Sequence, residues 1–136
     1  MEKIYVDAEN VVLGRLGSYV AKQLLRGSEV VVVNSEKSII SGNQDVIVDK
    51  LKNLRRKGGS SQKGPKFPKL ADRLLKRMIR GMLPWAKPKG REAFKRLRCY
   101  VGNNLTAEEQ KKLVKIKTNV PIKYMTLERV IELIWK

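Results

Sequence analysis

The chain has 136 residues, the size of one domain, and its 30 Lys and Arg residues against 13 Asp and Glu give a formal net charge of +17. This excess is larger than solubility requires and indicates a polyanionic partner, with nucleic acid the first candidate and an acidic membrane surface the second. The absence of histidine excludes imidazole catalysis and His-ligated zinc, and the lone Cys99 excludes an internal disulfide. The first ten residues lack the pattern of a signal peptide and no segment is apolar over the length of a membrane span, so we expect a cytoplasmic protein.

The N-terminal part of the chain predicts a β-α-β unit. A short apolar run at residues 3–6 forms the first strand, and four valines at residues 30–33 predict a strand covered on both faces. Between them, residues 13–27 have helical periodicity, with Gly27 as the expected end of the helix. The apolar side of this helix consists of Leu13, Leu16, Val20 and Leu24. A second helix is expected at about residues 43–57.

The C-terminal part of the chain predicts one strand and two helices. Residues 98–102 have the composition of a short strand, and Thr106 with Glu109 forms the capping box of a helix near residues 107–114. Thr126 is the expected N-cap of the final helix. Because strands alternate with helices along the chain, we predict an α/β layer fold with a mostly parallel sheet.

The positive charge is concentrated in the middle of the chain. Residues 52–98 contain 17 basic and 2 acidic side chains, a net charge of +15. Residues 1–51 contain 6 basic and 7 acidic side chains (net −1), and residues 99–136 contain 7 and 4 (net +3). We therefore predict a single domain over residues 1–136, with a basic RNA-binding arm and helix at about residues 55–98.

Within this middle section, residues 69–82 predict an amphipathic helix, although a disordered tail could share the composition. At about 100° per residue, the apolar and basic side chains fall on opposite sides of a helix. The apolar side consists of Ala71, Leu74, Leu75, Met78 and Met82. The basic side consists of Lys69, Arg73, Lys76, Arg77 and Arg80. One face is expected to pack against the protein and the other to remain cationic.

Residues 80–97 combine basic side chains with a tryptophan and two prolines. Pro84 and Pro88 predict a stiff crossing, and a short helix is expected to start at Gly90 and to expose three cations: Arg91, Lys95 and Arg98. Arg96 follows Glu92 at a spacing that allows an ion pair on a helix. Trp85 has two interpretations that the sequence leaves open, a hydrophobic anchor or a stacking face for an unpaired base.

The basic middle section predicts phosphate binding, because Lys and Arg neutralise the nucleic-acid backbone and release counterions. No helix-turn-helix, zinc-finger or basic-zipper pattern is present, and an irregular cationic arm that becomes ordered on binding is better matched to folded RNA than to regular duplex DNA. The candidate RNA-binding residues are Arg55, Arg56, Lys57, Lys63, Lys66, Lys69, Arg73, Lys76, Arg77, Arg80, Trp85, Lys87, Lys89, Arg91, Lys95 and Arg98.

Catalysis and cofactor binding are weaker interpretations. Gly14 and Gly17 lack the spacing of a dinucleotide-binding turn, and Gly17 is expected to approach the sheet closely. Asp7 ends the first predicted strand and is the best-placed catalytic carboxylate, with Glu36 or Asp49 as its possible partner. A turn-forming role for Asp7 is favoured, because no second acid lies at a spacing that would fix the pair. We expect no enzyme, no cofactor and no metal site.

Three segments together resemble a known family: VDAENVVLGRLGSYVAKQLLRG, VVVNSEKSIISG and KRMIRGMLPWAKPKGREAFKRLRCYVG. In this order and spacing they are similar to the universal large-subunit ribosomal protein thirteen family, in its archaeal and eukaryotic form, and the similarity covers nearly all of residues 3–136. The resemblance implies a three-layer α/β/α core with a four-stranded, largely parallel sheet. Positions that match the patterned segment of the family are Lys63, Gly64, Pro65, Arg80, Gly81, Met82, Leu83, Pro84, Gly90, Arg91, Leu97 and Arg98. Many members have histidine at the position of Trp85.

The residues and the resemblance together predict a structural constituent of the large ribosomal subunit in the cytoplasm. Its partners would be large-subunit (23S-type) ribosomal RNA, which it binds and helps to organise, and neighbouring large-subunit ribosomal proteins. No membrane and no small-molecule substrate are expected. The alternative is a regulatory RNA- or DNA-binding protein that acts alone, and an enzyme is the third choice.

Overall fold

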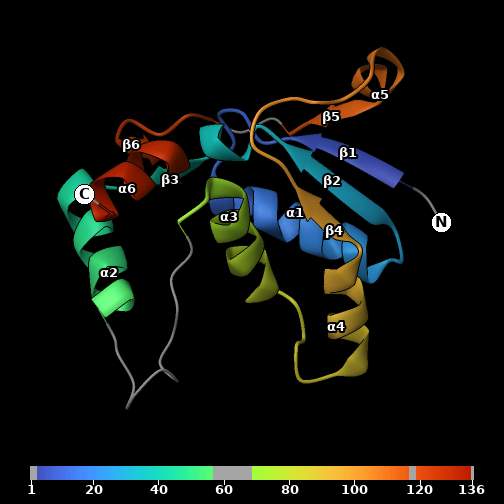
Figure 1. The fold of residues 1–136 in the computed structure, drawn as a ribbon, viewed down its shortest axis with the longest axis horizontal. Helices are drawn as coiled ribbons and strands as arrows, with labels where there is room; N and C mark the ends of the chain where they lie inside the picture. Colours follow the sequence, from blue (N-terminus) through green and yellow to red (C-terminus); the bar gives the residue numbers. More distant parts are fainter. Residues whose placement is uncertain (1–2, 57–68, 117–118, 136) are drawn as a thin grey trace.

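The computed structural model describes residues 3–56, 69–116 and 119–135. In chain order, the elements are β1 (Lys3–Asp7), α1 (Leu13–Leu25), β2 (Glu29–Val33), the 3₁₀ helix η1 (Ser35–Lys37), β3 (Ile39–Ser41), α2 (Gln44–Arg56), α3 (Ala71–Arg80), α4 (Pro88–Lys95), β4 (Leu97–Cys99), α5 (Ala107–Lys111), β5 (Leu113–Lys115), β6 (Tyr124–Thr126) and α6 (Leu127–Ile134). Figure 1 shows the sheet with α1, α3 and α4 along one side of it.

Four strands form a parallel sheet in the order β4-β2-β1-β5. The valine-rich strand β2 lies inside the sheet, and its side chains alternate between two apolar layers. Val30 and Val32 join the main core beneath α1 and α3, whereas Val31 and Val33 pack with Tyr5 on the other face. The prediction of a strand covered on both faces is therefore confirmed.

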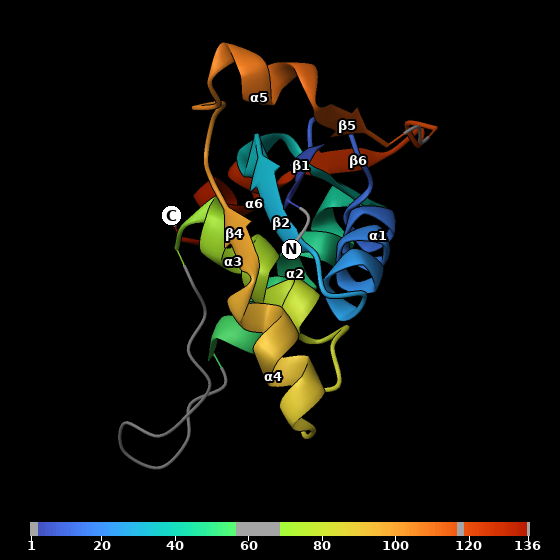
Figure 2. The same cartoon turned by 90° about the vertical axis from the view of Figure 1, so that its right-hand side faces the viewer.

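Helices cover this sheet and complete the predicted three-layer α/β/α core. On one face, α1 and α3 bury their apolar sides in the main core. On the other, Leu105 of the segment leading into α5 packs against the second apolar layer, and α5 lies beside the β5 edge in both views (Figure 2). Gly27 has φ +96° just after α1, as its predicted role at the helix end requires.

Gly17 was expected to approach the sheet closely, but it approaches α3 and the residues that follow it. A Cβ at Gly17 would lie 2.6 Å from the Sδ of Met82 and 3.8 Å from Ile79, so α1 meets α3 and the chain that follows α3, not the sheet. Met82 itself lies beyond the end of α3 and is 41% exposed. The prediction that Met82 lies within the helix was therefore wrong, whereas its expected packing against the protein is confirmed by the approach of its Sδ to Gly17.

A smaller unit of short strands and helices adjoins the sheet. β3 and β6 pair antiparallel, and α2 packs against α6. These helices share a second core made of Ile47, Val48, Leu51, Met125, Val130 and Ile134. The three-residue strands β3, β5 and β6 were not predicted. The equally short β4, at Leu97–Cys99, was predicted at residues 98–102. The helices were predicted with shifted ends: α2 at Gln44–Arg56 and α5 at Ala107–Lys111.

Hydrogen bonds at the helix starts confirm both predicted caps. The Thr106 hydroxyl accepts from the backbone N–H of Glu109 at 3.4 Å, while the Glu109 carboxylate accepts from the Thr106 N–H at 3.4 Å. Thr126 accepts from the N–H of Arg129 at 3.3 Å. Each hydroxyl satisfies a backbone donor that the first turn of a helix leaves without a partner, so each fixes where its helix begins.

Candidate nucleic-acid interface

The core of the candidate interface is the outer face of α3. Leu74, Leu75 and Ile79 are 1% exposed or less and anchor the helix in the main core. On the other side, Arg73 and Arg80 are exposed, and Lys76 and Arg77 are half-buried. The helix spans Ala71–Arg80 instead of residues 69–82, but its division into a packed face and a cationic face is confirmed.

The chain between α3 and α4 packs against the rest of the protein through a buried side chain and a close backbone contact. Leu83 is buried, and Pro88 occupies the start of α4, where its missing N–H costs no hydrogen bond. Gly90 packs so closely on the carbonyl of Pro84 that a Cβ there would collide with the carbonyl oxygen. The helix therefore starts at Pro88, two residues earlier than predicted, and Gly90 is needed for this close approach.

Arg91 fixes the same segment from its other side. Its Nε donates to the Trp85 carbonyl at 2.9 Å, and its Nη2 donates to the Ala86 carbonyl at 3.2 Å. These two bonds hold the backbone that presents Trp85 toward α3. Arg91 thus supports this segment, and its role in RNA binding stays a prediction.

Two aromatic rings lie next to the cations of α3, an arrangement we call the aromatic–cation ladder (Lys76, Phe94, Trp85 and Arg80). The Cζ of Arg80 lies 4.0 Å from the centroid of the Trp85 ring, and the Nζ of Lys76 lies 4.9 Å from that of Phe94. The two rings meet edge to face, with 5.2 Å between centroids and an interplanar angle of 86°. Both cation–ring distances are within the range of favourable cation–π interactions.

These side chains line an open cleft of about 470 Å³, which we call the α3 cleft. Its lining residues are Arg73, Lys76, Arg77, Arg80, Trp85 and Phe94. The four basic side chains of α3 stand against one acid on the same helix, Asp72, whose carboxylate accepts from the backbone N–H of Arg73 at 2.9 Å. Because the positive potential of these neighbours adds, the cleft is an attractive site for a polyanion.

The remaining predicted RNA-binding residues do not all join this cleft. Lys87, Lys89 and Lys95 are exposed on or before α4, whereas the Nζ of Lys69 lies 4.8 Å from the Trp135 ring, on the α6 side of α3. Arg98 was expected both at the start of the strand 98–102 and among the cations that the short helix exposes. It lies in β4, opposite Val31, so the strand is confirmed, and the residue faces the other side of the sheet from α3.

Arg98 instead belongs to a second basic cleft, of about 250 Å³. Its lining residues are Lys3, Glu29, Val31, Lys95, Arg96, Arg98 and Tyr100. The predicted pairing of Arg96 with Glu92 is replaced by a bond from its Nη2 to the Leu24 carbonyl at 2.7 Å, which ties the end of α4 to α1. Lys95 borders this cleft and not the one on α3.

Several predicted site residues lie outside the part of the chain that the structure describes. These are Lys57, Lys63 and Lys66, together with the Gly64 and Pro65 of the family pattern. Arg55 and Arg56 end α2, and only their backbone is described. Their roles in RNA binding, and that of the predicted arm, stay predictions.

The candidate residues did not include Phe94 of the first cleft, nor Lys3, Glu29, Val31, Arg96 and Tyr100 of the second. Phe94 could have been found as an aromatic residue between Arg91 and Lys95 in the basic section, a pattern common where rings and cations meet. Lys3 is the first residue of β1 and has no such signal, since it reaches the second cleft only through the register of Lys3 with Glu29.

Other reactive groups have structural roles. Asp7 is buried and accepts from the N–H of Glu9 and from the amide of Asn34, both at 3.0 Å, so its turn-forming role is confirmed. Burial raises the pKa of the Cys99 thiol to about 12, with Lys76 lowering it and Asp72 raising it, so the thiol is protonated at neutral pH. Glu36 accepts from the N–H of Gly102 at 3.0 Å.

Within the described ranges, no group of three acidic, Cys or His residues is arranged to hold a metal ion. None of the helices in those ranges has the length and hydropathy to cross a membrane. The features present are a basic helix beside two aromatic rings on a packed α/β core.

Comparison with known proteins points to one family. Residues 1–106 match the family described as Ribosomal protein L13. The chain is 50% identical over 127 residues to large ribosomal subunit protein uL13 of Methanocaldococcus jannaschii, covering 90% of both chains. It is 42% identical over 125 residues to uL13 of Thermoplasma volcanium (90% and 91% covered) and 41% over 130 residues to that of Archaeoglobus fulgidus (92% and 83%). The chain belongs to the ribosomal protein L13 family, in its archaeal form.

Proposed function

We propose that this protein is a structural constituent of the large ribosomal subunit, without catalysis of its own, and that it binds and organises large-subunit ribosomal RNA through the α3 cleft. Family membership supports the place in the large subunit, among RNA and other ribosomal proteins. The observation that carries the RNA-binding role is that four cations and two aromatic rings from α3, the 81–87 segment and α4 line one open cleft.

The cleft has the chemistry that an RNA backbone requires. Each cation that contacts a phosphate releases condensed counterions, which supplies affinity and makes it fall with salt. Arg73 and Arg80 can also form forked hydrogen bonds with phosphate oxygens. Since Leu74, Leu75 and Ile79 fix α3 in the core, the cations are held on a rigid element before RNA binds. The core therefore acts as the support that positions the charge.

Sedimentation of large subunits tests this function against the alternative of a regulatory protein that acts alone. The protein is expected to co-sediment with large subunits through a moderate salt wash and to protect a defined region of their RNA from hydroxyl radicals. A protein found only in the free pool, or one that protects no region, would contradict the proposal. A second basic cleft around Arg98 predicts that protection extends to a separate stretch of RNA.

A further inference from the structure

Trp85 lies in the α3 cleft, where its ring could either stack on a base or serve the protein itself. The Cζ of Arg80 is 4.0 Å from the centroid of the Trp85 ring, so a ring face is occupied by a guanidinium of the same chain. The edge-to-face contact with Phe94 restrains the ring from another side. A base that stacked on the occupied face would have to displace Arg80 and lose its cation–π contact.

The same relation holds one helical turn earlier, between Lys76 and Phe94. Lys76 and Arg80 are four residues apart on one face of α3, and each has one ring of the aromatic–cation ladder beside it. Long basic side chains lose rotamer freedom when they bind a partner. Contact with a ring restricts them before binding and leaves their N–H groups available, so the rings prepare the cations for an anion.

The position of Trp85 is fixed by contacts that the protein makes with the backbone of residues 84–86. Arg91 donates to the carbonyls of Trp85 and Ala86, and Gly90 packs on Pro84 just before them. These contacts fix both ends of the segment that carries the ring. Trp85 therefore does not need RNA to reach its place next to Arg80.

We propose that Trp85 is a positioning residue: its ring orients the guanidinium of Arg80 toward phosphodiester groups of folded RNA, and it does not stack on an unpaired base. This inference rests on the proposed function of the α3 cleft and names the chemistry that it recognises, the backbone phosphate. Phe94 has the same relation to Lys76.

A double-mutant cycle tests the coupling of the two residues. Arg80→Ala, Trp85→Ala, the double variant and the conservative Trp85→Phe are compared in binding to large-subunit ribosomal RNA at one salt concentration. Arg80→Ala and Trp85→Ala are each expected to weaken binding about two- to fivefold, and the double variant no more than Arg80→Ala alone. Trp85→Phe, which keeps a ring face, should bind within about twofold of the parent chain.

The salt dependence separates positioning from stacking. If Trp85 acts through Arg80, Trp85→Ala should flatten the slope of log affinity against log salt toward that of Arg80→Ala, by up to about one phosphate contact. Independent stacking would instead leave the slope unchanged and make the losses of the two single variants add, which would overturn the inference.

Fluorescence supplies a readout that does not depend on the stability of Trp85→Ala. In a Trp135→Phe background, Trp85 is the remaining tryptophan of the chain. A uridine oligonucleotide of about 12 residues, at saturation, should leave its emission nearly unquenched. Strong quenching would overturn the positioning role. The RNA-binding measurements separate the two proposals. If Arg80→Ala bound RNA like the parent chain, the proposed function of the cleft would fail. If Arg80→Ala weakened binding but Trp85→Ala did not, only the positioning role of Trp85 would fail.

Discussion

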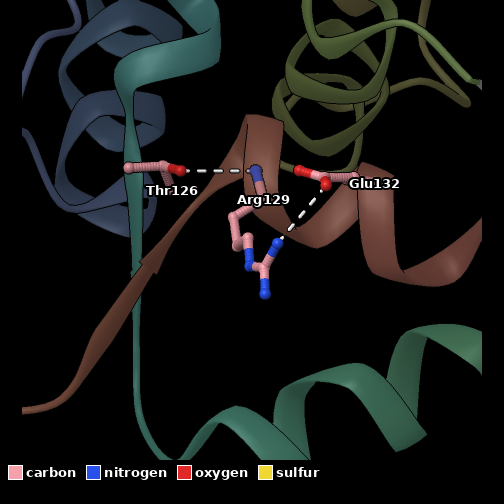
Figure 3. A network of polar contacts seen from close by, with 3 residues as sticks. All are labelled: Thr126, Arg129 and Glu132. Carbon is pink, nitrogen blue, oxygen red and sulfur yellow. Dashed lines mark hydrogen bonds and ion pairs between the residues drawn. The ribbon is translucent and has the colours of Figure 1, made fainter.

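Helices α3 and α6 pack against each other. Their buried faces are similar, but their exposed faces differ in how basic residues are balanced by acidic ones. Both bury branched aliphatic side chains, Leu74, Leu75 and Ile79 in α3 and Val130 and Ile134 in α6. On the outer face of α6, Arg129 forms an ion pair with Glu132 at 3.3 Å, and its backbone N–H is bonded to Thr126 (Figure 3). On α3, four basic residues share one acid, and cations rest against aromatic rings.

This difference in charge balance shows which property of an exposed helix face indicates a binding role. The cation of α6 is balanced by an acid on its own helix, as on an ordinary solvated face. The charges of α3 repel one another, a cost that a helix without a polyanionic partner has no reason to bear. The proposed binding role of α3 therefore rests on the excess of basic over acidic residues on this helix, and not on the presence of basic residues alone.

The largest effect on stability is expected at Gly90, where α4 packs closely on the backbone of the segment that follows α3. Gly90→Ala places a Cβ against the Pro84 carbonyl and should destabilise the protein by about 1–3 kcal/mol while displacing Trp85 from Arg80. Denaturant unfolding measures the loss. Gly14→Ala is the matched control, because a Cβ at Gly14 meets no atom within 4 Å, and it should leave stability unchanged or raise it. Equal behaviour of the two variants would contradict the packing described.

A smaller loss is expected on the α6 side, at its N-cap. Thr126→Ala removes the acceptor of the Arg129 N–H and should lower the free energy of unfolding by about 1 kcal/mol. RNA affinity should not change, since this end of α6 is not part of the α3 cleft. Thermal unfolding and filter binding on the same sample check both statements. Weaker RNA binding at unchanged stability would extend the interface to α6.

The smallest effect is expected from breaking the ion pair of α6. Glu132→Gln leaves Arg129 without its carboxylate, but both side chains are more than half exposed, so the loss should be about 0.5 kcal/mol or less. It also makes α6 more like α3 by exposing a cation that an acid had balanced. Glu132→Gln and the loss of one α3 cation change the net charge by the same amount in opposite directions. If Glu132→Gln strengthened RNA binding as much as the loss of one α3 cation weakens it, net charge and not the α3 cleft would explain the affinity.

Periodicity in the sequence was sufficient to predict the helices, because the hydrogen bonds and the same-face spacing of a helix link residues only three or four positions apart. The apolar residues of α1, α3 and α6 recur at helical spacing, and caps such as Thr106 with Glu109 mark where helices begin. Three-residue strands such as β3 and β6 are too short to show alternation, and they pair only because distant segments meet. The sequence therefore predicted β1, β2 and β4 of the main sheet and the α-helices of both units, including α2 and α6, but not the short strands β3, β5 and β6.

The candidate site was predictable in composition and less so in geometry. The sequence placed Arg73, Lys76, Arg77 and Arg80 on one face of α3. It could not show that Arg96 bonds to Leu24, 72 positions away along the chain, or that Arg98 lies on the opposite face of the sheet. Side-chain direction in β4 follows from its register with β2, which is a property of the folded sheet.

The central claim is that the cations of α3, and not the total charge of the protein, carry RNA binding. The direct test compares two variants that each lose three positive charges. One is Arg73→Gln/Lys76→Gln/Arg80→Gln on α3. The control is Lys111→Gln/Lys112→Gln/Lys115→Gln, in α5, in β5 and at the residue between them, at the opposite edge of the sheet from β4 (Figure 2). Affinity for large-subunit ribosomal RNA is measured against salt concentration. The α3 variant should flatten the log–log slope by about 2–3, and the control should leave it nearly unchanged. Equal changes in the two variants would contradict the account.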